Sequence, residues 1–253
     1  MNTGDLLEQV VEAHGGRSRW QTVESIEASL SSGGFAFASR LQPFALLGLK
    51  IRVNPHGCQV VLEGFCRDDC RGIWTPNHVQ IRNANDVLVC ERQEPRKQFR
   101  RWVKQFRWDK LDILYFAGYA LWNYLSFPFI LDLPGVAVAE KESANAQASS
   151  QLVASFPHSV PTHSATQSFH LDASHLLVRH DYTADVIGSW AHAANCCLAS
   201  EQVDGLRFYT RRKVYPLLRQ RTVLPFPILV WIELDDIKVK MAESPPPPAV
   251  HFE

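Results

Sequence analysis

Apolar and polar residues alternate along most of this chain, and a period of two is typical of β-strands. Gly, Pro, Asn and Asp gather between the alternating stretches at close intervals, so the strands are expected to form an antiparallel meander. In the first half the predicted strands lie at 26–30, 35–37, 47–53, 60–62, 79–81 and 87–90, with a bulge at Gly33-Gly34. In the second half they lie at 152–156, 165–171, 176–186, 192–201, 206–215 and 228–240.

A helical period replaces this alternation in three places. Residues 4–13 predict a short helix, and apolar residues spaced i, i+3, i+4, i+7 over 97–107 predict an amphipathic basic helix. A third helix is expected at 110–126, with Asp109 as its N-cap. The pattern therefore predicts a mainly β (α+β) fold. In it, a curved antiparallel sheet of about ten strands holds the helices on its concave face.

Composition is consistent with one domain, predicted at 1–240, with the helical insert at about 97–131 and a disordered, Pro-rich tail at 241–253. Lys plus Arg and Asp plus Glu number 26 each, so no overall field favours nucleic acid. The first residues show no basic region followed by an apolar run, so a secretory signal is not expected. We therefore expect a cytoplasmic protein with its six cysteines reduced.

The stretch from Ile113 to Leu131 carries no charge and is long enough for a transmembrane helix. Basic residues crowd its N-terminal side, as they would at a cytoplasmic flank. Asn123, Ser126 and Pro128 interrupt its apolar character, and the strands need a cover for their apolar face. A buried helix is therefore the favoured interpretation, with membrane association as the alternative.

One face of this helix could bind a ligand. Tyr115, Tyr119 and Trp122 are spaced i, i+4, i+7, with Asp112 and Asn123 flanking them. Buried tyrosine and tryptophan need a partner for their polar atoms, and rings with converging hydroxyls suit a flat or hydrophobic ligand. An aromatic core satisfied internally is an equally weighted alternative.

A second candidate site is His180 and Tyr182, which strand alternation places on one face, with Arg179 and Asp181 on the other. If His163 lies on a neighbouring strand, this group could perform acid–base chemistry near neutral pH, with His180 as the proton shuttle and Asp112 as a further catalytic candidate. A polar network that only stabilises the strands is the alternative, and a register one residue different would turn Asp181 inward.

Alternation also turns one of Arg211 and Arg212 inward, where it could bind a carboxylate or pair with an aspartate. Zinc is not expected, because the spacings within His56-x-Cys58 and Cys66-x₃-Cys70 are irregular. Nucleotide fingerprints and nucleophile motifs are absent from the sequence. We therefore expect no metal and no cofactor.

Motifs over nearly the whole chain resemble a large group of uncharacterised bacterial proteins. The most specific is Tyr115-Phe116-Ala117-Gly118-Tyr119-Ala120-Leu121-Trp122-Asn123-Tyr124. The others are His14-Gly15-Gly16 with Trp20, Glu91-Arg92 with Pro95-Arg96, Trp108-Asp109, Pro134-Gly135-Val136, Phe156-Pro157, Thr162-His163-Ser164, His180-Asp181-Tyr182 and Arg211-Arg212-Lys213-Val214-Tyr215. The group is similar to the lipoprotein-carrier (LolA-like) half-barrel, in which a curved antiparallel sheet encloses a hydrophobic cavity plugged by helices.

The group has no established activity, so binding of a hydrophobic or aromatic small molecule is expected from the aromatic helix face together with the cavity that the half-barrel implies. The chain would act as a carrier, or as a cofactor-independent lyase, isomerase or cyclase of a specialised biosynthetic pathway. The violacein-pathway enzyme VioE, a distant fold analogue, works without a cofactor. Carriers of this fold are periplasmic, so the expected lack of an export signal argues against lipoprotein transport. Asp112 stands where the group has a histidine, and residues 141–151 are richer in Ala and Ser than in the group.

Overall fold

Thirteen strands form a single antiparallel sheet in the computed structural model, which describes residues 3–141, 148–218 and 222–242. The order across the sheet is β6-β5-β4-β3-β2-β1-β13-β12-β11-β10-β9-β8-β7. The strands are β1 (Val23–Gly33), β2 (Leu46–Asn54), β3 (Gln59–Glu63), β4 (Cys70–Thr75), β5 (His78–Asn83), β6 (Leu88–Gln93), β7 (Ala137–Lys141), β8 (Ser150–Ser155), β9 (Thr166–Leu171), β10 (Leu177–Thr183), β11 (His192–Val203), β12 (Leu206–Pro216) and β13 (Val230–Met241).

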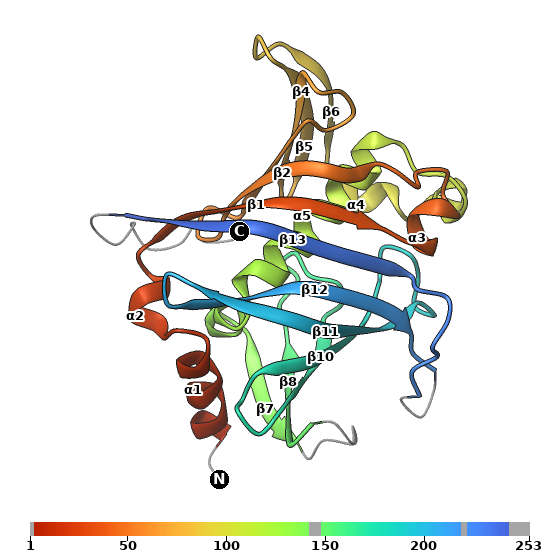
Figure 1. The fold of residues 1–253 in the computed structure, drawn as a ribbon. Coiled ribbons are helices and arrows are strands. Elements are labelled where there is room, and N and C mark those ends of the chain that lie inside the picture. The colour runs from red at the N-terminus through yellow and green to blue at the C-terminus, as the bar shows by residue number, and fades with distance from the viewer. Residues whose placement is uncertain (1–2, 142–147, 219–221, 243–253) are drawn as a thin grey trace.

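Helices fill the concave side and the ends of this sheet. The sheet curls around the longest of them, α5, so the predicted curved sheet with a helix on its concave face is confirmed (Figure 1). The α-helices are α1 (Thr3–Ala13), α2 (Arg17–Trp20), α3 (Phe35–Ala38), α4 (Pro95–Gln98) and α5 (Lys110–Ser126). The 3-10 turns are η1 (Trp102–Gln105) and η2 (Phe129–Asp132).

Helix α5 starts where the sequence predicts. The Asp109 carboxylate accepts a hydrogen bond from the backbone N–H of Asp112 at 3.0 Å, and the Asp112 carboxylate accepts one from the N–H of Asp109 at 2.8 Å. This reciprocal capping box satisfies two N–H groups that have no partner within the helix. From Leu111 to Ser126 every side chain is buried, because the sheet surrounds the helix on several sides.

Helix α1 is attached to the sheet through His14, which is fully buried. The His14 Nδ1 donates to the carbonyl oxygen of Val10 at 2.7 Å, so its Nε2 is the acceptor for the Tyr209 hydroxyl at 2.8 Å. Gly15 must be glycine, because φ is +111° there and a Cβ would lie 2.2 Å from the carbonyl oxygen of Gly205. The His14-Gly15-Gly16 motif therefore joins α1 to β12.

One local prediction is wrong, and two strands were not predicted. Residues 35–37 form the helical turn α3 rather than a strand after a bulge, since Gly34 at φ +128° redirects the chain and the N–H of Phe35 bonds to the carbonyl oxygen of Ile228. Strands β4 and β7 were not predicted. They are short, and β4 contains Gly72, which breaks the apolar alternation.

The amphipathic helix predicted over 97–107 is also wrong. The segment forms α4, a break and η1, so the four apolar residues do not share a face. Phe99 is buried against Trp108 at a ring-centroid distance of 5.4 Å, whereas Trp102 and Phe106 are exposed. Phe99 and Trp108 fill the space against α5, so Trp102, Val103 and Phe106 remain exposed to solvent.

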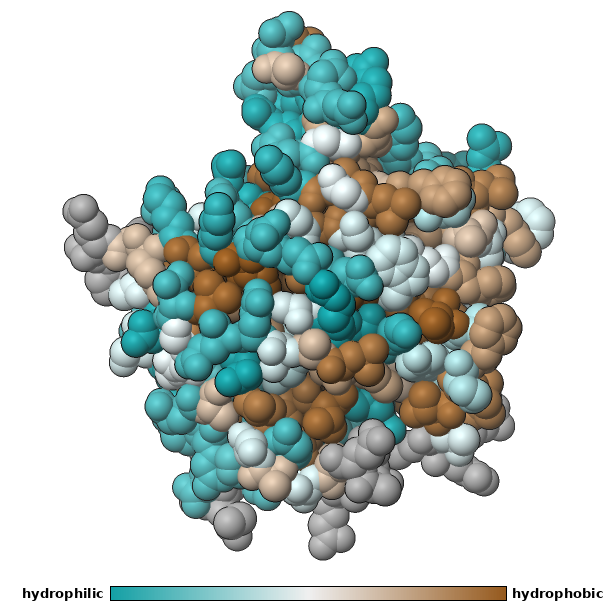
Figure 2. Space-filling view, in the orientation of Figure 1, coloured by the Kyte–Doolittle hydropathy of each residue, from teal (hydrophilic) through white to brown (hydrophobic). Residues whose placement is uncertain are grey.

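The outer face of the sheet carries mostly polar and charged side chains with smaller apolar patches between them (Figure 2). Within the part of the chain described, no helix is long and apolar enough to cross a bilayer. Helix α5 ends at Ser126, and η2 follows it within the stretch that composition alone allowed to span a membrane. Of the predicted tail at 241–253, only Met241 and Ala242 are described.

Candidate functional site

His180, Tyr182 and His163 lie close together on the concave side of the sheet, although His163 comes from a loop and not from a neighbouring strand. His163 lies in the loop before β9, and its ring stacks on that of Tyr182 with centroids 3.8 Å apart. The His163 and His180 rings are 6.1 Å apart, and His180 shares a hydrogen bond of 2.6 Å with the Gln167 amide oxygen. The Tyr182 hydroxyl meets the hydroxyl of Tyr124, from α5, at 3.0 Å.

The strand register also places the arginines. Arg212 turns inward, with its guanidinium 4.6 Å from the Tyr124 ring and 5.1 Å from the Tyr209 ring. Arg211 turns outward and bonds to the Asp235 carboxylate at 2.6 Å. Arg179 pairs with Asp181 at 2.8 Å, and the alternation places this pair on the face of β10 opposite His180, as predicted.

Burial keeps this His–Tyr cluster neutral. Desolvation holds the pKa of His163 and of His180 well below the ordinary histidine value, and the positive charge of Arg212 lowers both further. Desolvation raises the pKa of Tyr119 and of Tyr182 well above 10. Both ring nitrogens of His163 and the Tyr119 hydroxyl lack hydrogen-bond partners, which is uncommon for fully buried groups.

The other residues proposed on α5 make bonds that stabilise the fold. Trp122 Nε1 donates to the carbonyl oxygen of Pro55 at 2.9 Å, and the Asn123 amide donates to the carbonyl oxygens of Tyr119 and Pro161, both at 2.7 Å. Asp112 pairs with Arg92 and Lys104 in addition to capping the helix. Tyr115 packs on Tyr119 with ring centroids 5.5 Å apart.

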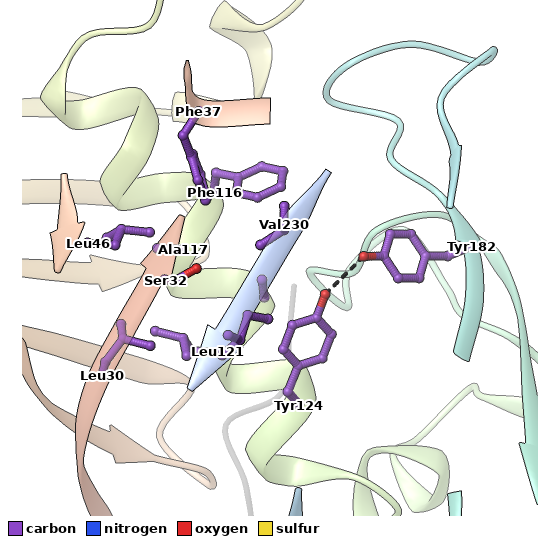
Figure 3. A pocket seen from close by; sticks show the side chains of 12 residues that line it. Leu30, Ser32, Phe37, Leu46, Phe116, Ala117, Leu121, Tyr124, Tyr182 and Val230 are labelled. Atoms are coloured by element: carbon purple, nitrogen blue, oxygen red, sulfur yellow. Dashed lines mark hydrogen bonds between the residues drawn. The ribbon is translucent and has the colours of Figure 1, made fainter. Parts of the chain in front are cut away.

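The space between α5, β1 and β13 holds an apolar cavity of about 30 Å³ (Figure 3). Phe37, Phe116 and Val230 line it on one side, and the bonded hydroxyls of Tyr124 and Tyr182 close another. This volume suits about one or two water molecules, whereas pockets for organic ligands measure roughly 300–1,000 Å³. The interior of the half-barrel is therefore filled by its own side chains.

A much larger cleft, of about 680 Å³, opens between the β4–β5 turn, α4 and the β10–β11 loop. Phe99, Val186 and Ile187 supply apolar wall, and Arg96 also lines an adjoining hollow of about 130 Å³. Further lining residues are Pro76, Asn77, Glu94, Lys97, Arg100, Gln105, His158, Asp185 and Gly188.

Arg96 is held firmly at the junction of cleft and hollow. Its Nη1 donates to the carbonyl oxygen of Thr162 at 2.9 Å and to the Tyr115 hydroxyl at 3.4 Å, and its guanidinium lies 5.9 Å from the Tyr119 ring. Within the described ranges no carboxylate lies within ion-pair distance of Arg96, although Asp185 also lines the cleft and is close enough to interact electrostatically with it. Arg96 thus presents to the cleft a cation that Asp185 offsets without a direct ion pair.

Sequence reasoning missed Arg96 as a site residue. The helix predicted at 97–107 started one residue later and left its basic residues on a solvated face. The pair Pro95-Arg96 could have indicated that Arg96 has a fixed position, because Pro at the first position of α4 sets where the helical turn begins.

No three His, Cys, Asp or Glu side chains among the described residues are grouped so that they could hold a metal ion. His56 shares a hydrogen bond with the carbonyl oxygen of Trp20 at 3.1 Å, and Cys58 is buried in the core. The expectation that the protein needs no metal or cofactor stays a prediction.

The sequence matches no protein-family model and no curated protein. Its structure is similar to that of a DUF1329 family protein from Desulfovibrio piger, with a TM-score of 0.50 and 11% identity over 96% of this chain and 95% of that one. A LolA superfamily protein from Nitrosomonas europaea scores 0.46 at 10% identity, with 95% and 94% covered. At such identities the likeness shows the fold alone, an open, curved antiparallel sheet of the half-barrel kind.

Proposed function

We propose that this protein binds a small hydrophobic or aromatic molecule that carries an acidic group, and that the molecule sits in the cleft at Arg96. The observation that supports this most directly is an anchored arginine that forms no direct ion pair within the described residues and lines a cleft of about 680 Å³. The half-barrel acts as the rigid support for this site.

Charge is the first reason. A guanidinium presents its N–H groups as a planar fork that matches a carboxylate, sulfonate or phosphate. Nη1 of Arg96 is occupied by Thr162 and Tyr115, which leaves the rest of the fork for a ligand. Lys97 and Arg100 line the same cleft and add positive charge, and Glu94 and Asp185 partly offset it.

Shape and polarity are the second reason. The cleft has the volume of a typical small-molecule site, whereas the closed cavity beside Tyr124 and Tyr182 does not. Phe99 offers an aromatic surface, and Val186 and Ile187 offer aliphatic ones. An apolar body would pack against these side chains while its acidic group reaches Arg96.

A cofactor-independent lyase, isomerase or cyclase is a second candidate, and His163 favours it. An imidazole with two unpaired nitrogens in a buried site is costly and is typical of functional positions. In this structure Tyr119 and Tyr182 pack on the His163 ring, and the ring does not line the cleft. This candidate can be tested once a substrate is identified. If folded His163→Ala and His180→Ala variants keep full turnover, the acid–base role of these histidines is wrong and the binding function is favoured.

The binding proposal can be tested with 8-anilinonaphthalene-1-sulfonate, an aromatic probe with one acidic group. We expect its fluorescence to rise on binding, and Arg96→Gln to raise its Kd about 10-fold or more, because charged hydrogen bonds contribute roughly 1.5–3 kcal/mol. Asp185→Asn should tighten binding, since it removes a negative charge from the cleft. Fluorescence titration of folded variants, checked by circular dichroism, measures both.

Two controls make this result specific. Arg52→Gln alters an arginine on the outer groove of β1 and β2 and should leave the Kd unchanged. The uncharged analogue N-phenyl-1-naphthylamine should bind wild type and Arg96→Gln alike. Equal sulfonate affinity in wild type and Arg96→Gln would contradict the proposal, and so would an unchanged affinity in Asp185→Asn.

A further inference from the structure

The segment after α4 exposes a cluster of apolar side chains. Trp102, Val103 and Phe106 are 78%, 45% and 58% exposed, and the Trp102 and Phe106 rings contact each other with centroids 5.1 Å apart. These three residues, with Arg101 and Arg107, are called the Trp102 surface below. Two neighbouring aromatic rings at such exposure are costly in water, which marks the surface as an interaction site.

The chain holds this surface in place from both sides. Phe99 is buried between Trp108 and Tyr115, and Trp108 Nε1 donates to the carbonyl oxygen of Lys104 at 2.8 Å. Lys104 pairs with Asp109 at 3.0 Å and with Asp112, so η1 is tied to the N-terminus of α5. The exposed rings are therefore presented by an anchored turn.

The charge around the rings has one sign. Between residues 95 and 108 the sequence has six basic residues and no acidic one. Lys104 is paired with the α5 cap and exposed Lys97 with Glu94. Throughout 3–141, 148–218 and 222–242, no carboxylate forms an ion pair with Arg100, Arg101 or Arg107. The Trp102 surface thus combines exposed aromatic rings with uncompensated positive charge.

We propose that the Trp102 surface docks this protein onto membranes that contain anionic lipid. Tryptophan and phenylalanine insert at the level of the headgroups, and unpaired arginines bind the anionic lipids around them. A bilayer fits better than an acidic protein, because the rings are exposed on a turn and line none of the clefts described above. The association is peripheral and involves no membrane-spanning segment, and it does not depend on the cleft ligand.

Sedimentation with unilamellar vesicles tests this docking at about 0.1 M ionic strength. We expect the full chain to bind phosphatidylcholine vesicles that contain phosphatidylglycerol, and to bind pure phosphatidylcholine much more weakly. Trp102→Ser with Phe106→Ser should reduce the partition coefficient about 30-fold, since most of the inserted apolar area is lost. Arg101→Gln with Arg107→Gln should also reduce it about 30-fold, at about one kcal/mol per arginine.

The control is Leu198→Ser, which removes from β11 an apolar side chain that is 57% exposed, close to the 58% of Phe106, and which should leave vesicle binding unchanged. Equal binding to neutral and anionic vesicles would overturn the proposal, as would full binding by either double variant. Displacement of the protein from vesicles by an oligonucleotide at equal phosphate concentration would favour a nucleic-acid surface instead. Arg96→Gln changes the cleft but not the Trp102 surface, so this variant should still bind vesicles. The vesicle experiment therefore tests the docking proposal independently of the cleft proposal.

Discussion

Gly118→Ala is expected to lower the free energy of unfolding by ~2–3 kcal/mol. This is the opposite of the intrinsic preference, since alanine is more favourable than glycine inside a helix by about 1 kcal/mol. A Cβ at this position of α5 would lie 2.2 Å from Cγ of Trp74 and 2.5 Å from its Cβ. Trp74 is fully buried and belongs to β4, so neither the ring nor the strand has room to yield. Urea unfolding followed by tryptophan fluorescence measures the change.

A double-mutant cycle supplies the control for this clash. Trp74→Gly alone should be destabilising because it leaves a cavity, but Gly118→Ala in that background should cost little or become stabilising, because the Cβ and Cγ atoms that it would meet are both gone. The two substitutions should therefore couple strongly. Additive effects would show that Gly118 does not set the approach of α5 to β4.

Stability is expected to fall steeply as pH drops below about 6.5, because three buried histidines stay neutral in the native state. Desolvation lowers the pKa of His14 to about 4, and it holds those of His163 and His180 well below 6.5. Below pH 6.5 these histidines bind protons in the unfolded chain but stay unprotonated in the folded chain. Each histidine then costs up to about 1.4 kcal/mol per pH unit, and for His14 the loss totals about 3 kcal/mol by pH 4.

Chemical unfolding at pH 7.5, 6.5 and 5.5 measures this slope, in units of protons taken up on unfolding. His14→Gln and His163→Asn should each reduce the uptake by about half a proton at pH 6.5 and by nearly one proton at pH 5.5, even though both variants start less stable than wild type. A free energy of unfolding that is constant between these pH values would show that the buried imidazoles accept protons in the folded state.

The central helix could be predicted because several independent signals agree there. Asp109 is a strong N-cap, the residues from Ile113 onward carry no charge, and the strands on both sides need an apolar partner. Alternation along β10 likewise placed His180 and Tyr182 together. Period-two patterns resolve the faces of a strand as long as the register does not slip.

The cleft could not be predicted, because long-range packing decides it. The apolar spacing from Phe99 to Phe106 matches a helix, yet burial of Phe99 against Trp108 breaks the segment and exposes Trp102. The position of Arg96 depends on the carbonyl group of Thr162, which is 66 residues away in sequence. Local patterns carry no information about such a pairing.

The pairing of β1 with β13 has a consequence for synthesis of the protein. These strands lie side by side in the middle of the sheet, with Ile26 opposite Val239 and Leu30 opposite Leu234 (Figure 1). The seam can close only after residues 230–241 have left the ribosome. Until then the free edge of β1 is open to pairing with other chains. The edge of β1 that faces β13 therefore stays unprotected while residues 34–229 are synthesised, and chaperones would have to shield it.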